Sequence, residues 1–154
     1  RNRGLRSLRT PASVDFGALV RLRVLSLSHN DLADIGPVAD LPSLVELNVN
    51  HNRIRDLAPA FQCEELEVLL AANNCVAYLD GLDGLQLKVL RRMSLFSNQL
   101  TDLDSLFPLL AALPGLASLD LGGNPCVEDA SHRYSIMRAM PTLVELDGEE
   151  LRAV

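Results

Sequence analysis

The chain has 154 residues, a formal net charge of −6 at pH 7 and a hydrophobic fraction of 48%, which fits one domain with a sizeable core. Aromatic residues make up 4% and tryptophan is absent, so aliphatic side chains must fill that core. The negative charge argues against direct binding of nucleic acid or anionic membranes, and no apolar run approaches the roughly 20 residues of a membrane span.

Residues 1–21 carry five arginines among a few apolar side chains. We expect residues 1–12 to be a loosely ordered lead-in, and residues 13–21 to be the second half of an incomplete repeat that covers the first complete one. A basic arm for an acidic partner is the functional alternative to a solvated terminal segment. Because the chain opens on Arg1 and not on methionine, we expect a fragment or a processed form.

Five copies of one pattern follow. The first is Leu22 to Leu32 (LRVLSLSHNDL), with leucine at its positions one, four, six and eleven and asparagine at position nine. The successive asparagines lie 22, 22, 24 and 26 residues apart, the period and consensus of a leucine-rich repeat solenoid. We number positions within each repeat from its first leucine. The other four copies begin at Leu44, Leu66, Leu90 and Leu116.

The alternation inside each copy predicts a strand with one buried face. Leu25 and Leu27 alternate with Ser26 and Ser28, and stacked copies can pair in parallel to close a core. The asparagines must find partners when buried, so we expect a ladder of bonds to neighbouring turns. Residues 22–123 therefore predict an α/β solenoid with a curved parallel sheet on its concave face, and 3₁₀ turns and short helices on its convex face.

The segments that link the strands carry aspartates ahead of prolines. Asp34 and Asp56 lie 22 residues apart, with Pro37 and Pro59 at matching places, which predicts capped 3₁₀ turns. The longer segment 102–113 has room for a short α-helix. A row of aspartates could also suggest a metal or catalytic site, but capping is the simpler interpretation.

Residues 124–154 leave the repeat pattern and predict a cap. We expect a helix over 128–140 with Ile136, Met137 and Met140 on one face, ended by Pro141, and then a final strand through Leu146. Such a cap covers the end of a solenoid that would otherwise expose its core and sheet edge.

The Asn-Pro pair, the helix with its aromatic-Arg pair, and Pro-x-Leu-x-x-Leu-Asp-Gly at 141–148 resemble the C-terminal cap of intracellular leucine-rich repeat proteins. The repeats resemble the short 22-residue class of the protein phosphatase 1 regulatory subunit, the axonemal dynein leucine-rich light chain, the spliceosomal A-prime protein and the acidic nuclear phosphoproteins. The resemblance covers residues 22–150. The family has Tyr-Arg nine residues before the cap proline, whereas this chain has His132-Arg133 there and Tyr134 one residue later, so the packing of the cap helix should differ.

Positions three, five and seven should point outward onto the concave face. There, Val68, Leu70, Ala72 and Phe96 predict an apolar patch with a charged rim, which is typical of a protein-binding site. An N-terminal or upstream segment that folds back over the patch is the alternative. The predicted partner-binding residues are Val24, Glu46, Asn48, Asn50, Val68, Leu70, Ala72, Arg92 and Phe96.

Signals for chemistry are weak. His29 and His51 share position eight of adjacent repeats, but a third metal ligand is missing from that row, so coincidence is favoured over a metal site or pH switch. No hydrolase, P-loop, Cys-x-x-Cys or zinc-protease motif occurs, and Glu46 and Asp120 lie several strands apart. We therefore predict no enzyme activity, no cofactor and no metal.

The sequence predicts an adaptor that binds a protein through its concave face, as a monomer within a larger complex. Three unpaired cysteines and the absence of an N-glycosylation sequon favour an intracellular, cytoplasmic protein. Within the resembled families, a ciliary or dynein-associated role comes first and phosphatase regulation next. The alternatives are a nuclear ribonucleoprotein subunit that binds a partner protein, and a targeting module of a larger enzyme.

Overall fold

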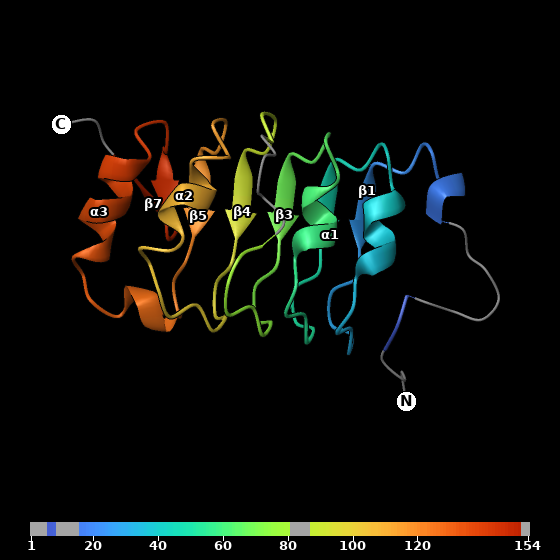
Figure 1. Ribbon diagram of the computed structural model, residues 1–154, viewed down its shortest axis with the longest axis horizontal. Coiled ribbons are helices and arrows are strands. Elements are labelled where there is room, and N and C mark those ends of the chain that lie inside the picture. The colour runs from blue at the N-terminus through green and yellow to red at the C-terminus, as the bar shows by residue number, and fades with distance from the viewer. Residues whose placement is uncertain (1–5, 9–15, 81–86, 152–154) are drawn as a thin grey trace.

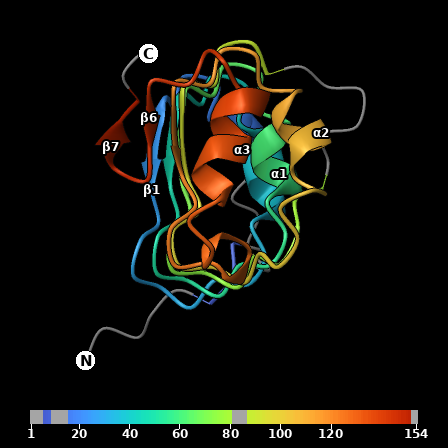
Figure 2. The same ribbon diagram turned by 90° about the vertical axis from the view of Figure 1, so that its left-hand side faces the viewer.

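The computed structural model describes residues 6–8, 16–80 and 87–151. The strands form one seven-stranded sheet in which they follow one another in chain order along the molecule. The helical turns lie on one face of this sheet (Figures 1 and 2). This arrangement confirms the predicted α/β solenoid with a parallel sheet. The strands are β1 (Val24–Ser26), β2 (Glu46–Asn48), β3 (Val68–Leu70), β4 (Arg92–Ser94), β5 (Ser118–Asp120), β6 (Glu145–Leu146) and β7 (Glu149–Glu150).

Equivalent positions of successive repeats lie side by side in the sheet. Leu47 pairs with Leu69, and Leu69 with Met93, with no offset from strand to strand. These position-four side chains are at most 1% exposed, whereas Leu25 in the first strand is only half-buried. The aliphatic core is therefore fully closed from the second repeat onward.

The position-nine asparagines form the predicted ladder. Asn98 is 7% exposed, and its Nδ2 donates to the carbonyl oxygens of Ala71 at 2.9 Å and Leu95 at 3.0 Å. Its Oδ1 accepts from the backbone N–H of Val76 at 3.0 Å. One amide thus joins the turns of two repeats, and it satisfies backbone groups that would otherwise be buried without partners. Asn52, Asn74 and Asn124 make the same kinds of bond.

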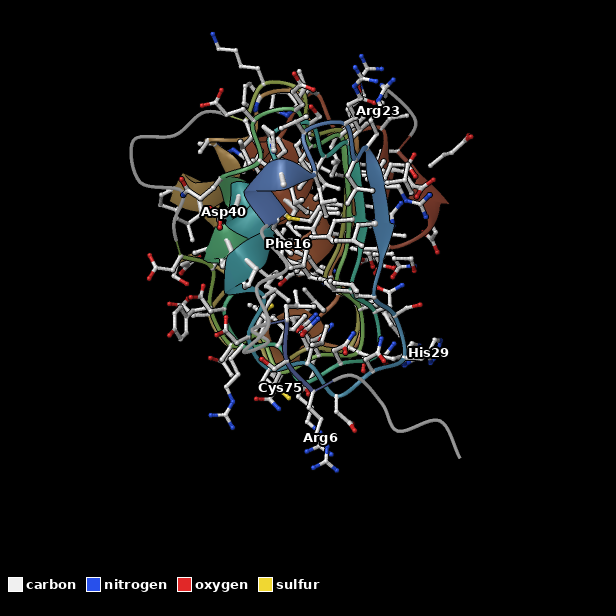
Figure 3. All side chains as sticks on the ribbon, turned by 90° about the vertical axis from the view of Figure 1, so that its right-hand side faces the viewer. Arg6, Phe16, Arg23, His29, Asp40 and Cys75 are labelled. Carbon is white, nitrogen blue, oxygen red and sulfur yellow. The ribbon has the colours of Figure 1, made fainter. Side chains whose placement is uncertain are left out.

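The convex side carries short helical turns, in part as predicted, although the described residues between β3 and β4 include none. The element η2 (Gly36–Asp40) is 3₁₀, but the next, α1 (Ala58–Phe61), is a single α-turn. In the long linker, α2 covers only Phe107–Leu110. Residues 102–105 form a turn instead, in which the Asp102 carboxylate accepts from the Asp104 N–H and the Asp102 carbonyl accepts from Ser105 Oγ. A further 3₁₀ turn, η1 (Phe16–Ala18), packs beside η2 at the N-terminal end (Figure 3).

The linker aspartates act as turn-forming side chains, one residue earlier than the predicted cap. Asp34 Oδ1 accepts from the N–H of Gly36 at 2.7 Å, and Asp56 Oδ1 accepts from the N–H of Ala58 at 2.8 Å. The residues at the N-cap itself are Ile35 and Leu57, which have no side-chain oxygen. The aspartates therefore close turns that lead into each helix.

The C-terminal segment closes the solenoid with η3 (Pro125–Val127), α3 (His132–Ala139) and an unpredicted hairpin. Helix α3 begins four residues later than expected, and its residue Ile136 is fully buried. Strand β7 pairs antiparallel with β6 across Asp147-Gly148, which have φ of 53° and 80°, as a tight hairpin turn requires.

His132 fills the place where the resembled family has tyrosine. Its Nε2 lies 3.1 Å from Asp147 Oδ2, and Arg133 Nη1 lies 2.8 Å from Glu149 Oε2, so both side chains tie the helix to the hairpin. Tyr134 is 72% exposed. Because His132 stands where the resembled family has tyrosine, a His132–Asp147 contact forms at this place and Tyr134 is left in solvent. The predicted lead-in over residues 1–12 lies outside the described residues except at 6–8, where Leu8 packs against the core.

Candidate binding surface on the concave face

The outward strand positions form continuous rows across the sheet. Position three runs from Glu46 to Val68 to Arg92, and position five places Leu70 between Asn48 and Ser94. Backbone hydrogen bonds between adjacent repeats continue past the strand ends, since the N–H of Asn73 donates to the carbonyl of Phe96 at 2.8 Å. Leu70 and Phe96 therefore share the strand face of the solenoid.

The apolar patch consists of Val68, Leu70, Ala72 and Phe96. The first two are half-buried, Ala72 is 9% exposed and Phe96 is 44% exposed. The ring of Phe96 leans across Gly122 of the next repeat, where an added Cβ would lie 3.2 Å from Phe96 Cδ2. Val24, which is 59% exposed, is separated from the patch by Glu46 in the position-three row.

Asn48 and Asn50 of the predicted site form hydrogen bonds to the backbone beside the patch. Asn48 Oδ1 accepts from the N–H of Asn50 at 3.0 Å, and Asn50 Oδ1 accepts from the N–H of Ala72 at 2.7 Å. Each side-chain oxygen thereby satisfies a backbone group at the end of a strand. The geometry gives these two residues a structural part in addition to any contact with a partner.

Position eight of every repeat has a left-handed backbone. The φ values are 58° at His29, 56° at His51, 56° at Asn73, 54° at Ser97 and 70° at Gly123. The rings of His29 and His51, which share this position in adjacent repeats, are stacked with centroids 4.3 Å apart and planes 13° from parallel. Among the described residues, no group of three potential metal-ligating side chains comes together, here or elsewhere.

The acidic end of the concave face was not predicted from the sequence. Strand β6 of the cap places Glu145 beside Ser118, whose Oγ donates to Glu145 Oε1 at 2.9 Å, and Asp147 follows. Burial raises the pKa of Asp120, and the Asp147 and Glu145 carboxylates raise it further, against the lowering effect of the Gly122 N–H bond. Only the packing of the cap on β5 brings these groups together.

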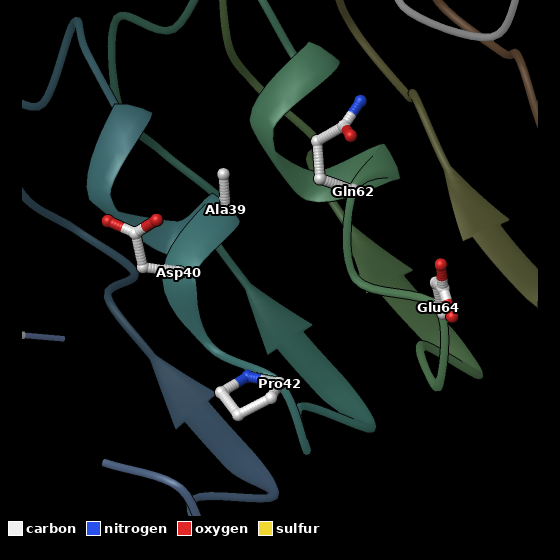
Figure 4. Close-up of a pocket in the computed structure, with 5 residues that line it drawn as sticks. All are labelled: Ala39, Asp40, Pro42, Gln62 and Glu64. Atoms are coloured by element: carbon white, nitrogen blue, oxygen red, sulfur yellow. The ribbon is translucent and has the colours of Figure 1, made fainter. Parts of the chain in front are cut away.

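Within residues 16–80 and 87–151, the convex face offers no comparable site. A hollow of about 270 Å³ lies between η2 and α1, lined by Ala39, Asp40, Pro42, Gln62 and Glu64. The carboxylates of Asp40 and Glu64 come from different repeats and do not point toward one another (Figure 4). The buried thiol of Cys63 donates to the carbonyl of Val38, and burial raises its pKa to about 11, which leaves it unreactive.

Comparison with known proteins agrees with the repeat geometry. A family model described as "Leucine Rich repeats (2 copies)" matches residues 20–63, which contain the repeats that begin at Leu22 and Leu44. The chain is a leucine-rich repeat protein. This fold is typically that of a non-enzymatic scaffold.

Two curated relatives of this leucine-rich repeat protein are an enzyme subunit and an assembly factor. The human geranylgeranyl transferase type-2 subunit alpha is 34% identical over 123 residues, which are 79% of this chain and 21% of that protein. The dynein axonemal assembly factor 11 of Trypanosoma brucei brucei is 32% identical over 165 residues, covering 94% of this chain and 37% of that protein. The chain thus spans about a fifth and somewhat more than a third of these relatives.

Solved structures show the same fold. A leucine-rich repeat protein of Leptospira interrogans superimposes with a TM-score of 0.71 at 33% identity, over 84% of this chain and 32% of that one. The SNF/U2A′ complex of Drosophila melanogaster gives a TM-score of 0.67 at 22% identity, over 98% of this chain and 82% of that one. In the part of the chain that the structure describes, no helix has the length and apolar character to cross a membrane.

Replacing Asp120 by asparagine should raise the melting temperature of the leucine-rich repeat protein at pH 7. At about pH 3 the same change should leave the melting temperature nearly unchanged. The raised pKa means that the folded state holds the Asp120 proton more tightly than the unfolded state, so ionisation destabilises the fold as pH rises. Asparagine cannot ionise, yet its oxygen can still accept from the Gly122 N–H. Thermal melts across this pH range would measure the difference.

The matched control is Asp104→Asn, which changes an exposed carboxylate in a linking segment. We expect it to melt like the wild type at both pH values. An advantage of Asp120→Asn that persisted at low pH would point to hydrogen bonding or packing and would contradict charge repulsion as the cause.

Proposed function

We propose that this chain is a non-enzymatic adaptor that binds a partner protein across its concave face. The observation that carries the proposal is the apolar patch itself. The core is filled by inward residues such as Leu69 and Met93, which are fully buried, so packing does not require apolar side chains at outward positions. Exposed apolar surface beside charged side chains is the usual composition of a protein-binding site.

The relatives support two cellular settings. A ciliary or axonemal role in the cytoplasm is supported by the trypanosome dynein axonemal assembly factor, whose alignment covers 94% of this chain. In this role we expect the chain to act as a monomer within a larger complex. A targeting module of a larger enzyme is the second candidate, supported by the geranylgeranyl transferase alpha subunits, in which the similar segment is 21% of the protein. Whether the gene that encodes this chain also encodes a catalytic domain would distinguish the two settings.

Phe96→Ala and Leu70→Ala should each weaken partner binding by about 1–2 kcal/mol or more, because each removes apolar contact area at the centre of the patch. Both side chains are outside the core, so the melting temperature should change little. Partners recovered by pull-down from a ciliated-cell extract would be identified and their dissociation constants measured by calorimetry.

Tyr134→Ala is the matched control, since this aromatic side chain is 72% exposed on the cap helix and away from the concave strands. It should bind as the wild type does. A partner that bound Phe96→Ala normally while that variant lost stability, or that responded equally to Tyr134→Ala, would place binding elsewhere.

A further inference from the structure

At Gly122 an aromatic ring and a carboxylate come close together on the concave face. A Cβ at this position would lie 3.2 Å from Phe96 Cδ2 and 3.3 Å from Asp120 Oδ1. The backbone of Gly122 is not left-handed, unlike that of Gly123, so its conformation does not require glycine. Glycine fits because the Phe96 ring and the Asp120 carboxylate already crowd the volume that a Cβ would need, so both groups lie against Gly122.

The carboxylates near Gly122 have little positive charge to balance them. Asp120 accepts from the Gly122 N–H, and Glu145 accepts from Ser118. Across residues 6–8, 16–80 and 87–151, no lysine or arginine forms an ion pair with either carboxylate, although Arg92 lies on the neighbouring strand. Asp147, the third carboxylate, contacts His132. Partly desolvated like charges destabilise one another, and a cation placed among them would offset that cost.

We propose that Phe96, Asp120 and Glu145 form a cation-binding corner that receives one arginine or lysine side chain of the partner. The inference rests on the proposed function and deepens it. A guanidinium or ammonium group can pair with the carboxylates while its stem or charged plane packs on the aromatic ring. An apolar surface joined to a carboxylate corner selects a partner segment with apolar residues and a basic residue at one end.

The corner also fixes the direction of the bound segment. Leu70 and Asp120 occupy the same sheet row, with Ser94 of β4 between them. Apolar residues of the partner therefore lie over β3 and its basic residue lies over β5. Glu64, an exposed carboxylate that lines the hollow on the convex face, provides a matched acidic control.

The test is a peptide-display selection from a random library on the immobilised chain, followed by measurement of dissociation constants for the most enriched peptide. We expect enriched peptides to share apolar residues and at least one lysine or arginine. Replacing that residue by citrulline or glutamine should weaken binding to the wild type at least tenfold. Asp120→Asn and Glu145→Gln should also weaken binding of the basic peptide, whereas Glu64→Gln should not.

Two comparisons make the outcomes decisive. The neutral peptide should bind wild type and Asp120→Asn equally, since the cation and the carboxylate act as a pair. Because Asp120→Asn is expected to stabilise the fold, its loss of binding cannot come from unfolding. Enriched peptides without basic residues, or equal effects of Asp120→Asn and Glu64→Gln, would overturn the corner. If Phe96→Ala still abolished binding, the concave site would stand without the corner; if it had no effect, the proposed function would fail as well.

Discussion

Truncation of Leu69 to alanine should lower the free energy of unfolding by about 2–5 kcal/mol. Leu69 is fully buried on the central strand, and its backbone neighbours in the sheet are Leu47 and Met93. The change removes apolar contacts and leaves a cavity in the middle of the stack, where the repeats on both sides hold the walls apart. Urea unfolding followed by far-ultraviolet circular dichroism would measure the loss.

The adjacent leucine supplies the control. Leu70 is the same residue type on the same strand, but it points to the concave face and is half-buried. We expect Leu70→Ala to cost less than about 1 kcal/mol of stability, because no enclosed cavity forms. Equal losses for the two variants would mean that both leucines belong to the core, which would remove the apolar patch and the proposed function together.

Replacement of Asn98 by alanine should lower the free energy of unfolding by about 1–3 kcal/mol, because it leaves buried backbone groups without partners. The side chain donates to the carbonyls of Ala71 and Leu95 and accepts from the N–H of Val76. Alanine cannot replace any of these bonds, and the site is too enclosed for bulk water. The midpoint of urea unfolding would report the effect.

Two further variants isolate the ladder as the cause. Gln99 is the next residue and is exposed, so Gln99→Ala should change stability by no more than about 0.5 kcal/mol. Asn98→Asp retains the acceptor but, when ionised, has no N–H donors for the two carbonyls, so it should destabilise the fold at least as much as alanine. If Asn98→Asp were as stable as the wild type, the donated bonds would contribute nothing.

The cap shows where prediction from the sequence ended. Ile136 and Leu146 were predicted to be buried from apolar spacing, and both are. The hairpin partner of β6 was missed because Glu149-Glu150 is exposed and has no apolar alternation. The His132–Asp147 contact was missed as well, since it joins side chains 15 residues apart and depends on how the helix docks.

The binding surface divides in the same way. The face on which Leu70 and Phe96 lie followed from strand alternation, which is a local property of the chain. The lean of Phe96 across Gly122 depends on a repeat whose sequence is 26 residues further on, and no local pattern encodes it. The left-handed backbone at His29 and His51 was not predicted either, since it comes from the turn geometry that every repeat shares.

By itself the sequence determined the repeat, its period, the buried aliphatic positions and the asparagine ladder. These follow from short-range alternation, because a strand with one apolar face can be covered only by stacking on copies of itself. The tertiary structure alone decided that Asp120 meets Glu145 and Asp147 beside Phe96. Their proximity depends on the register in which the cap strand pairs with β5, and register is fixed by packing between segments rather than within them.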